Sequence, residues 1–361
     1  MIERIIIENF KSIRKLDLEL KPINILIGAN GAGKSNFISF FKLLKSLYVG
    51  NLNFLIGHNI SSFLHFGRKR SKYFYGLIDI ENTTATHFRI SPEFNSNAAY
   101  IEKLGVLLNT QNISKNYEEW KEVFNETTKT ESDLYQIDEP YAGNIQDYFD
   151  NSRVYHFQDV SEEARIKLPN KINDNKYLRE NGENLASYLY YLQEKHSRNF
   201  RIIEAQIRSV ASFFNRFDLE PDRLRKNYVE LRWFEKGSED YFDAYDLSDG
   251  TLRFMALTTL LMQPELPKVI IIDEPELGLH PFAINKLAAM IKQAAKKGSQ
   301  VIVSTQSVNL IDNFEPEDVI AVDRDDNQSV FKRLNSEDLK EWLEDYTLGD
   351  LWNKNLFGAR P

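Results

Sequence analysis

The chain has 361 residues, of which 42% are hydrophobic and 27% are charged, a composition typical of a globular protein with about two domains. It has no cysteine, which excludes disulfide bonds and thiolate metal sites, and its formal net charge of −8 argues against a generally cationic nucleic-acid binder. No apolar run reaches the roughly 18 residues that a membrane helix needs, and the N-terminus lacks the plan of a signal peptide. We therefore expect a soluble, cytoplasmic protein with no membrane partner.

The start of the chain predicts three strands followed by a helix. Alternating or β-branched apolar residues mark strands in ERIIIENF and LDLEL, and INILIG is a buried-strand run that ends in glycine. From Lys34 to about Leu47, apolar residues recur at helical spacing. A further strand is predicted in residues 72–81.

Between the third strand and this helix lies GANGAGKS, residues 28–35, which fits the phosphate-binding pattern G-x-x-x-x-G-K-[S/T] in the required strand–loop–helix context. Glycines let backbone N–H groups approach a phosphate, and the helix N-terminus adds partial positive charge. Lys34 is expected to reach the β- and γ-phosphates, and the Ser35 hydroxyl to ligate Mg²⁺. The motif predicts a site for a nucleotide and Mg²⁺, with the nucleotide held by Asn30, Gly31, Ala32, Gly33, Lys34, Ser35 and Asn36.

The middle of the chain is the least regular part. Residues 85–180 are rich in Asn, Asp and Tyr, and we interpret them as a variable insertion that could form a lid. Helices are predicted in residues 183–196 and 199–217, followed by short strands in YVELRWFEK and YFDAYDL.

From Leu252 onward, helices alternate with continuously apolar strands. The strands are KVIIID and QVIVST, followed by DVIAVDR and SVFKRL, and a helix over 281–297 begins with proline and ends before Gly298. Such alternation predicts a mostly parallel sheet flanked by helices.

Two acids end the first of these strands, in VIIIDEPELGLHP. The carboxyl ends of parallel strands face the ligand crevice, so Asp273 is expected to ligate Mg²⁺. Glu274 has no evident structural partner and could accept a proton from the attacking water. The alternative is a solvated surface turn.

The sequence LSDGT, residues 247–251, places small polar residues at the start of a helix. Ser248, Asp249 and Gly250 could bind an anion there, because hydroxyl and backbone N–H groups suit phosphate oxygens. The alternative is a helix cap that serves only its own helix, since Ser and Asp are favoured caps.

Taken together, ENFKSIRKLDLEL, LSDGT, DEPELGLHP and VSTQS resemble the ABC-type ATPase heads of the SMC/RecF/OLD group. RVYHFQDVS and the tail LEDYTLGDLWNKNLFGARP are similar to one family of stand-alone bacterial predicted ATPases of about this length. The resemblance implies an ABC/SMC-like P-loop head with antiparallel N-terminal strands and an inserted helical lid. It divides the chain into an N-terminal lobe, the insertion, a C-terminal lobe and a tail packing on the head: 1–84, 85–217, 218–334 and 335–361.

In such heads the signature loop caps the γ-phosphate held by a second subunit. The resemblance thus implies a homodimer in which Ser248, Asp249 and Gly250 contact the partner's nucleotide, with Asp249 replacing the usual glycine. Gln306 in VSTQS replaces a switch histidine as γ-phosphate or water sensor, although glutamine cannot carry a histidine's positive charge. With Glu274 and Lys34, it completes the expected catalytic set.

Other matches are weaker. Glu276 or His280 could reach across the dimer, or His280 could simply begin the next helix. Gln158 is a weak candidate for the Q-loop glutamine and is better explained as structural. Lys11 and Ser12 line either the adenine or a surface turn.

By resemblance, the expected function is Mg-ATP hydrolysis that gates a separate effector protein, in bacterial defence. The alternative is a RecF-like repair ATPase that binds DNA, for which the basic run FGRKRSK, residues 66–72, is the best candidate surface; a solvated loop is the simpler explanation. A non-hydrolysing scaffold would have no need of Glu274. Roughly fifty residues follow the switch, too few for the Toprim domain of an OLD nuclease. The aromatic tail is expected to pack on the head, although it could also dock an effector.

Overall fold

The structure, a computed structural model, describes residues 1–57, 59–81, 84–93, 98–108, 126–129, 145 and 148–359. The chain forms two compact units, Met1–Arg153 with Glu315–Pro361, and Val154–Phe314. The fold class is α/β, as predicted, with antiparallel strands near the N-terminus and parallel strands next to helices. The four segments expected from the sequence have limits at 84, 217 and 334, which differ from the limits of these two units. The four-segment division stays a prediction.

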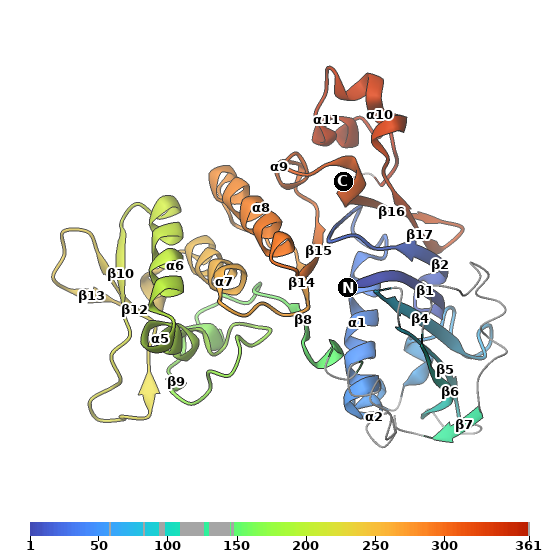
Figure 1. The fold of residues 1–361 in the computed structure, drawn as a ribbon, viewed down its shortest axis with the longest axis horizontal. Coiled ribbons are helices and arrows are strands. Elements are labelled where there is room, and N and C mark those ends of the chain that lie inside the picture. The colour runs from blue at the N-terminus through green and yellow to red at the C-terminus, as the bar shows by residue number, and fades with distance from the viewer. Residues whose placement is uncertain are drawn as a thin grey trace. The chain divides into compact units, whose positions relative to one another are not determined.

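The larger sheet of the first unit is antiparallel (Figure 1). Its order is β2-β1-β4-β5-β6-β7, formed by β1 (Ile2–Phe10), β2 (Ile13–Glu19), β4 (Phe74–Ile80), β5 (Thr84–Pro92), β6 (Ala99–Leu108) and β7 (Glu126–Lys129). Strands β5 and β6 come from the region interpreted as an insertion, so the beginning of that region is part of this sheet. Residues 109–125 and 130–144 of the expected insertion lie outside the described residues.

The first helix packs its phenylalanines on this sheet. Helix α1 (Lys34–Val49) is followed by the short α2 (Leu52–Ile56). The Phe40 ring centroid lies 5.2 Å from that of Phe10 and 5.8 Å from that of Phe88. A Cβ atom on Gly76 of β4 would lie 2.4 Å from Phe88 and 2.6 Å from Phe40, so glycine is needed there for the two rings to fit.

A second group of strands in this unit carries the phosphate-binding motif. The buried strand β3 (Ile23–Ile27) pairs in parallel with β16 (Val319–Asp325), and β16 pairs antiparallel with β17 (Gln328–Arg333). The tail adds α10 (Ser336–Leu343) and α11 (Leu348–Asn353). Trp352 is fully buried and donates to the Ala359 carbonyl, while Ala359 N donates to the Asp323 carboxylate at 3.1 Å. The tail is therefore anchored to β16 of its own unit.

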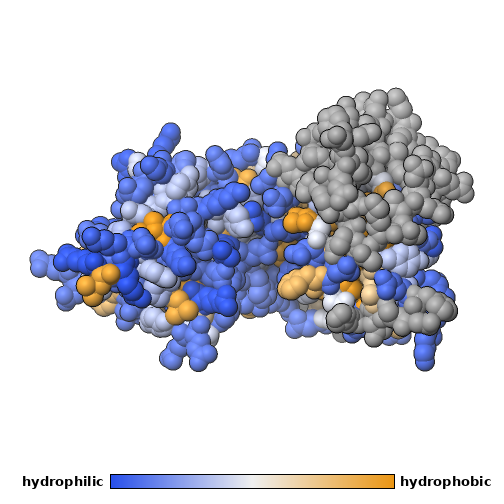
Figure 2. Space-filling view, turned by 90° about the horizontal axis from the view of Figure 1, so that it is seen from below, coloured by the Kyte–Doolittle hydropathy of each residue, from blue (hydrophilic) through white to orange (hydrophobic). Residues whose placement is uncertain are grey.

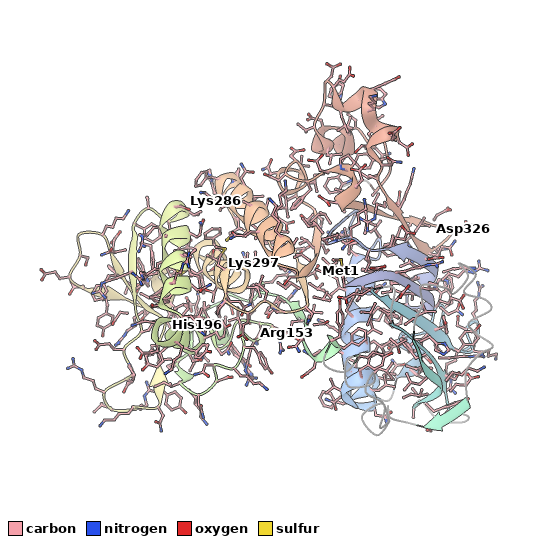
Figure 3. All side chains as sticks on the ribbon, viewed as in Figure 1. Met1, Arg153, His196, Lys286, Lys297 and Asp326 are labelled. Atoms are coloured by element: carbon pink, nitrogen blue, oxygen red, sulfur yellow. The ribbon has the colours of Figure 1, made fainter. Side chains whose placement is uncertain are left out.

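The second unit contains the strands that end in the acidic motif. Strand β14 (Val269–Asp273) pairs in parallel with β15 (Gln300–Thr305). Strand β8 (Ser152–Tyr155) contains the chain position at which the first unit ends and the second begins. The helices of the second unit include α7 (Asp249–Met262), α8 (Pro281–Lys296) and α9 (Val308–Ile311). Helix α8 carries Lys286, and Lys297 follows its last residue (Figure 3). The helix thus begins at the proline and ends just before Gly298, as the sequence predicted.

The rest of this unit combines two helices with short strands: α5 (Leu185–Lys195), α6 (Ser197–Val210), β9 (Asn170–Lys171), β10 (Phe214–Asp218), β11 (Tyr228–Val229), β12 (Arg232–Glu235) and β13 (Tyr241–Phe242). The helix predicted to reach Phe217 ends at Val210. The next residues form β10 because Phe217 pairs with Trp233 across the ladder and Phe214 stacks on the same indole at 6.2 Å. Aromatic cross-strand packing outweighs the helical spacing that the sequence suggested.

Figure 2 shows one face of the molecule, on which hydrophilic side chains predominate and apolar ones form small separate groups. Among the described residues, no helix combines the length and the apolar character needed to cross a bilayer.

Candidate nucleotide site

The phosphate-binding loop joins β3 to α1 in the first unit. Gly28, Gly31 and Gly33 all have positive φ angles, of 148°, 81° and 124°. A Cβ atom on Gly28 would lie 2.1 Å from the Val322 carbonyl oxygen of β16. Gly33 precedes α1 and offers no side chain, so the first N–H groups of the helix lack a side-chain cap. The loop thus combines glycine conformations with a helix start that has no side-chain cap, the arrangement on which a phosphate-binding loop depends.

Lys34 lies inside this loop. Its side chain is buried, and Nζ donates to the carbonyl oxygens of Gly28 and, at 3.1 Å, Ala29. The ammonium group is therefore already placed among the backbone groups that would surround the phosphates. Ser35 and Asn30 are exposed at the loop.

A network of side-chain hydrogen bonds supports the loop. Ser329 of β17 donates to the Ala32 carbonyl at 2.5 Å, and the Ser12 and Ser329 hydroxyls are 2.6 Å apart. Asn36 Nδ2 donates to Ser12 Oγ at 2.6 Å. Ser12 thus supports the loop rather than standing in a free surface turn, and Ser329 is a supporting residue that the sequence did not reveal. The direct nucleotide contact predicted for Asn36 stays a prediction.

Lys11 packs on aromatic rings. Its Nζ lies 5.7 Å from the Phe10 centroid and 5.3 Å from the Phe63 centroid, and burial and then Lys42 lower its pKa. The contact expected with adenine stays a prediction.

In the second unit, Asp273 and Glu274 stand at the carboxyl end of β14. Asp273 pairs with Ser304 of β15, and its Oδ2 lies 3.9 Å from Nδ1 of the exposed His156. Glu274 N donates to the Ser304 carbonyl at 2.8 Å, and Glu274 has a φ angle of 47°. A left-handed conformation costs a non-glycine residue about 1 kcal/mol, so the surrounding contacts must hold Glu274 in place.

Two amides supply those contacts. Gln306 Nε2 donates to one carboxylate oxygen of Glu274 at 2.6 Å, and Gln158 Nε2 donates to the other at 3.0 Å. The expectation that Glu274 lacks a structural partner is therefore wrong. Gln158 therefore contacts the predicted base, and its role as a Q-loop glutamine stays a prediction.

Glu276 faces inward. Its Oε1 accepts from Thr305 Oγ1 at 2.6 Å and from Gln306 N at 3.0 Å, while its buried Oε2 has no hydrogen-bond partner among the described residues. Burial raises the pKa of this carboxyl, although the two hydrogen bonds lower it. Glu276 is 9% exposed, and the reach across a dimer expected for Glu276 or His280 stays a prediction. His280 Nδ1 accepts from Phe282 N and so caps α8.

The signature loop begins α7. Ser248 Oγ accepts from Thr251 N at 3.2 Å, which is the helix cap weighed as the alternative, and Ser248 and Asp249 remain exposed. A Cβ atom on Gly250 would lie 2.2 Å from the Gly278 carbonyl oxygen. Gly250 is therefore needed for close packing on the segment after Glu274, whatever else it contacts.

Arg253 joins three parts of this unit. It is buried in α7, and its guanidinium donates to the carbonyls of Phe157 (2.9 Å), Gln158 (3.1 Å) and Leu277. Burial lowers its pKa. No local pattern indicated this residue, because its partners lie 24 to 96 positions away.

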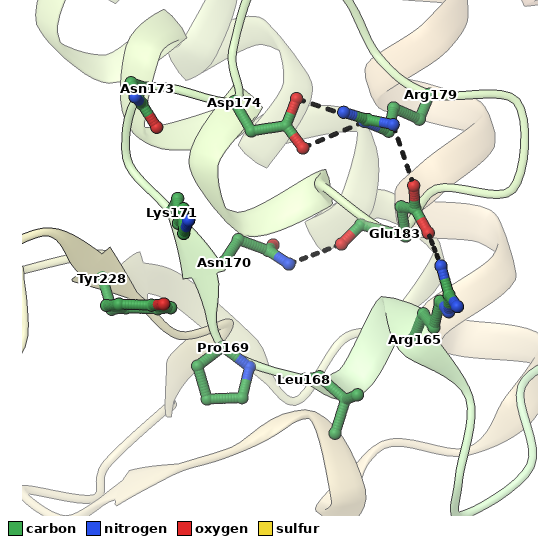
Figure 4. Close-up of a pocket in the computed structure, with 10 residues that line it drawn as sticks. All are labelled: Arg165, Leu168, Pro169, Asn170, Lys171, Asn173, Asp174, Arg179, Glu183 and Tyr228. Atoms are coloured by element: carbon green, nitrogen blue, oxygen red, sulfur yellow. Dashed lines mark hydrogen bonds and ion pairs between the residues drawn. The ribbon is translucent and has the colours of Figure 1, made fainter.

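A pocket of about 600 Å³ in this unit contains none of the predicted site residues (Figure 4). Arg179 lies 2.9 Å from Asp174 and 3.2 Å from Glu183, and Arg165 lies 3.1 Å from Glu183. Both arginines of the pocket are thus paired with carboxylates of the same pocket.

Comparison with known proteins shows the family of this chain. The family described as "AAA domain, putative AbiEii toxin, Type IV TA system" matches residues 23–312, more than half of the chain. The chain belongs to this family. As a member, it is an ABC-like P-loop protein of an ATPase family, as predicted.

Individual relatives share shorter stretches with this family member. The Old nuclease of Escherichia phage P2 is 27% identical over 51% of this chain, and the energy-coupling factor transporter ATP-binding protein EcfA2 of Streptococcus agalactiae is 31% identical over 27%. The chain spans about a third of the length of each. An SMC head solved with the C-winged helix domain of ScpA has a TM-score of 0.61 at 19% identity, covering 94% of this chain and 99% of that one. The Pyrococcus furiosus Smc head has a TM-score of 0.57 at 16% identity, over 95% and 98%. These two structures show the fold.

Proposed function

We propose that this family member hydrolyses ATP with Mg²⁺. The observation that carries the proposal is the Glu274 carboxylate, which directly follows Asp273 and is held on both oxygens by side-chain amides. A carboxylate oriented in this way suits a base that aligns a water molecule and accepts its proton. An ordinary surface turn would not need two amides and a left-handed backbone.

The other predicted residues have consistent parts in this proposal. The loop N–H groups and Lys34 would bind the phosphates, and the hydroxyl of Ser35 and the carboxylate of Asp273 are the hard oxygen ligands that Mg²⁺ prefers. When bound, the ion would neutralise phosphate charge. Gln306 and Gln158 would orient Glu274.

The proposal is tested with Glu274→Gln. This change keeps the size and one acceptor of the side chain but removes the base, so kcat should fall by about 10²-fold or more while ATP affinity is retained. Phosphate release and nucleotide binding are measured side by side. Glu265→Gln, which changes an exposed glutamate, should behave as wild type. Equal turnover by Glu274→Gln and wild type would exclude Glu274 as the base.

We further propose that nucleotide closes a head-to-tail homodimer which gates a separate effector, in bacterial defence. Support comes from the exposed Ser248 and Asp249, from the toxin-system description of the family and from the SMC head solved with another protein's domain. The dimer, the effector and the setting are all proposals for this chain.

The second candidate is a DNA-binding repair ATPase. Arg68 and Lys72 of the basic run line a pocket of about 440 Å³ together with Arg89. Arg68 donates to the Glu93 carbonyl and Arg89 pairs with Glu102 at 3.0 Å, so part of this charge is already engaged. DNA-stimulated hydrolysis that falls steeply with salt, in the same assay, would favour this candidate.

A further inference from the structure

Glu276 has no part in the proposed function so far, yet it is the most buried carboxylate of its segment. It lies two residues after Glu274, and one of its oxygens accepts from both Thr305 and the backbone of Gln306. Gln306 in turn uses its side-chain amide to donate to Glu274. A single residue, Gln306, therefore connects the two carboxylates.

In this connection Glu276 holds the backbone of Gln306, and the side chain of Gln306 holds Glu274. The backbone N–H of Gln306 follows the end of β15, where the chain leaves the sheet and is no longer held by ladder hydrogen bonds. Glu276 supplies the acceptor for that N–H and for the neighbouring Thr305 hydroxyl. These two hydrogen bonds fix the position of the Gln306 backbone, and therefore the point from which its side chain extends. A shift of about 1 Å in such a group is enough to reduce catalysis substantially.

We propose that Glu276 is a positioning residue that fixes Gln306 and, through its amide, aligns the carboxylate of Glu274. The inference deepens the proposed ATP hydrolysis and rests on it. Glu276 acts as a hydrogen-bond acceptor: its second oxygen is buried and has no hydrogen-bond partner among the residues described, so a neutral amide in its place keeps both contacts.

The test compares Glu276→Met with Glu276→Gln. Methionine fills the space but offers no oxygen, so kcat should fall about tenfold or more with little change in KM. Glutamine retains an acceptor for Thr305 and Gln306, so kcat should stay within about twofold of wild type. Wild-type kcat in Glu276→Met, or an equal loss in both variants, would overturn the inference.

A double-mutant cycle tests whether Glu276 acts through Gln306. If it does, Glu276→Met should cause no further loss of kcat in a Gln306→Ala background, because the aligned amide is already absent. Additive losses would show an independent action and overturn the inference. Should Glu276→Met not fold, Thr305→Val replaces it. This change removes the donor to Glu276 and also the acceptor for Ser307 N, and it should lower kcat by a smaller factor. An unchanged kcat would contradict the inference.

The inference and the proposed function fail in different ways. If the wild-type protein binds ATP but does not hydrolyse it, the proposed function is wrong. If hydrolysis depends on Glu274 but kcat does not change when Glu276 is replaced, only the inference about Glu276 is wrong. Thermal melting of each variant shows whether a lost kcat reflects unfolding.

Discussion

At the scale of single residues, the backbone of Glu274 shows how much structure supports one carboxylate. Its φ angle of 47° is unfavourable for a side chain of this size, and amides from Gln158 and Gln306 hold its two oxygens. Strain of this kind often occurs where a group must be held in one orientation for function. Close packing likewise requires glycine at position 28, because a Cβ atom on Gly28 would overlap the Val322 carbonyl.

A buried histidine makes stability sensitive to acid. His87 lies in β5 with its Nδ1 3.3 Å from the Tyr75 hydroxyl, and burial and then Lys103 lower its pKa to about 4. Between pH 6.5 and 4 the unfolded chain therefore binds a proton that the folded chain does not. Stability due to neutral His87 is fully present above pH 6.5 and is lost as pH falls, by about 2.5 kcal/mol at pH 4.5.

Urea unfolding at pH 7 and pH 4.5 checks this prediction. His87→Gln should lose less of its free energy of unfolding than wild type over that interval, because glutamine does not titrate. An identical pH dependence for wild type and His87→Gln would contradict the assignment.

At the scale of elements, helix α7 is linked to two loops of its unit. Gly250 lets its first turn pack against Gly278, and Arg253 binds the carbonyls of Phe157, Gln158 and Leu277. The loop that carries Gln158 and the segment that follows Glu274 are thus both held by the helix that Ser248 caps.

Replacing Arg253 should break this link. Arg253→Met leaves three carbonyl groups without their donor, which should lower the free energy of unfolding by about 2–4 kcal/mol. Lysine is a poor substitute, because it lacks the planar fork that reaches several carbonyls at once. Thermal melting should show a much smaller change for Arg201→Met, whose side chain is exposed on α6. Equal melting temperatures for the two variants would refute the structural importance of Arg253.

At the scale of the whole molecule, the proposed switch requires two copies of the chain. Ser248 and Asp249 are exposed at the start of α7, where the resemblance places a contact with a partner's γ-phosphate. A bulky cation there would obstruct such a contact and would also remove the helix cap, at a cost of about 1 kcal/mol.

Light scattering of the Glu274→Gln variant provides the measurement. Mg-ATP should double its molar mass, and Ser248→Arg in the same background should prevent this increase. Ser212→Arg adds the same charge at another exposed position of the unit and should leave the increase intact. A mass that never responds to ATP, although ATP binds, would leave Ser248 with the role of a helix cap and exclude the nucleotide-driven dimer.

The sequence alone determined the features that depend on neighbouring residues. GANGAGKS predicted a strand, a loop and a helix because glycine conformations and a following helical spacing are local properties, and Asp273 and Glu274 were placed at a strand end for the same reason. Helix α8 follows its proline and glycine signals. The resemblance that these motifs carry led to the family and the fold.

Only the tertiary structure decided which distant side chains meet. Gln158 touches Glu274 across 116 positions, and Ser329 reaches Ser12 across 317, so no local pattern could announce either pair. Phe214 and Phe217 form a strand because Trp233 packs against them, although their spacing suits a helix. Gly250 needs its hydrogen side chain because Gly278 lies against it. Local propensity selects the elements, whereas close packing and buried hydrogen bonds select their partners.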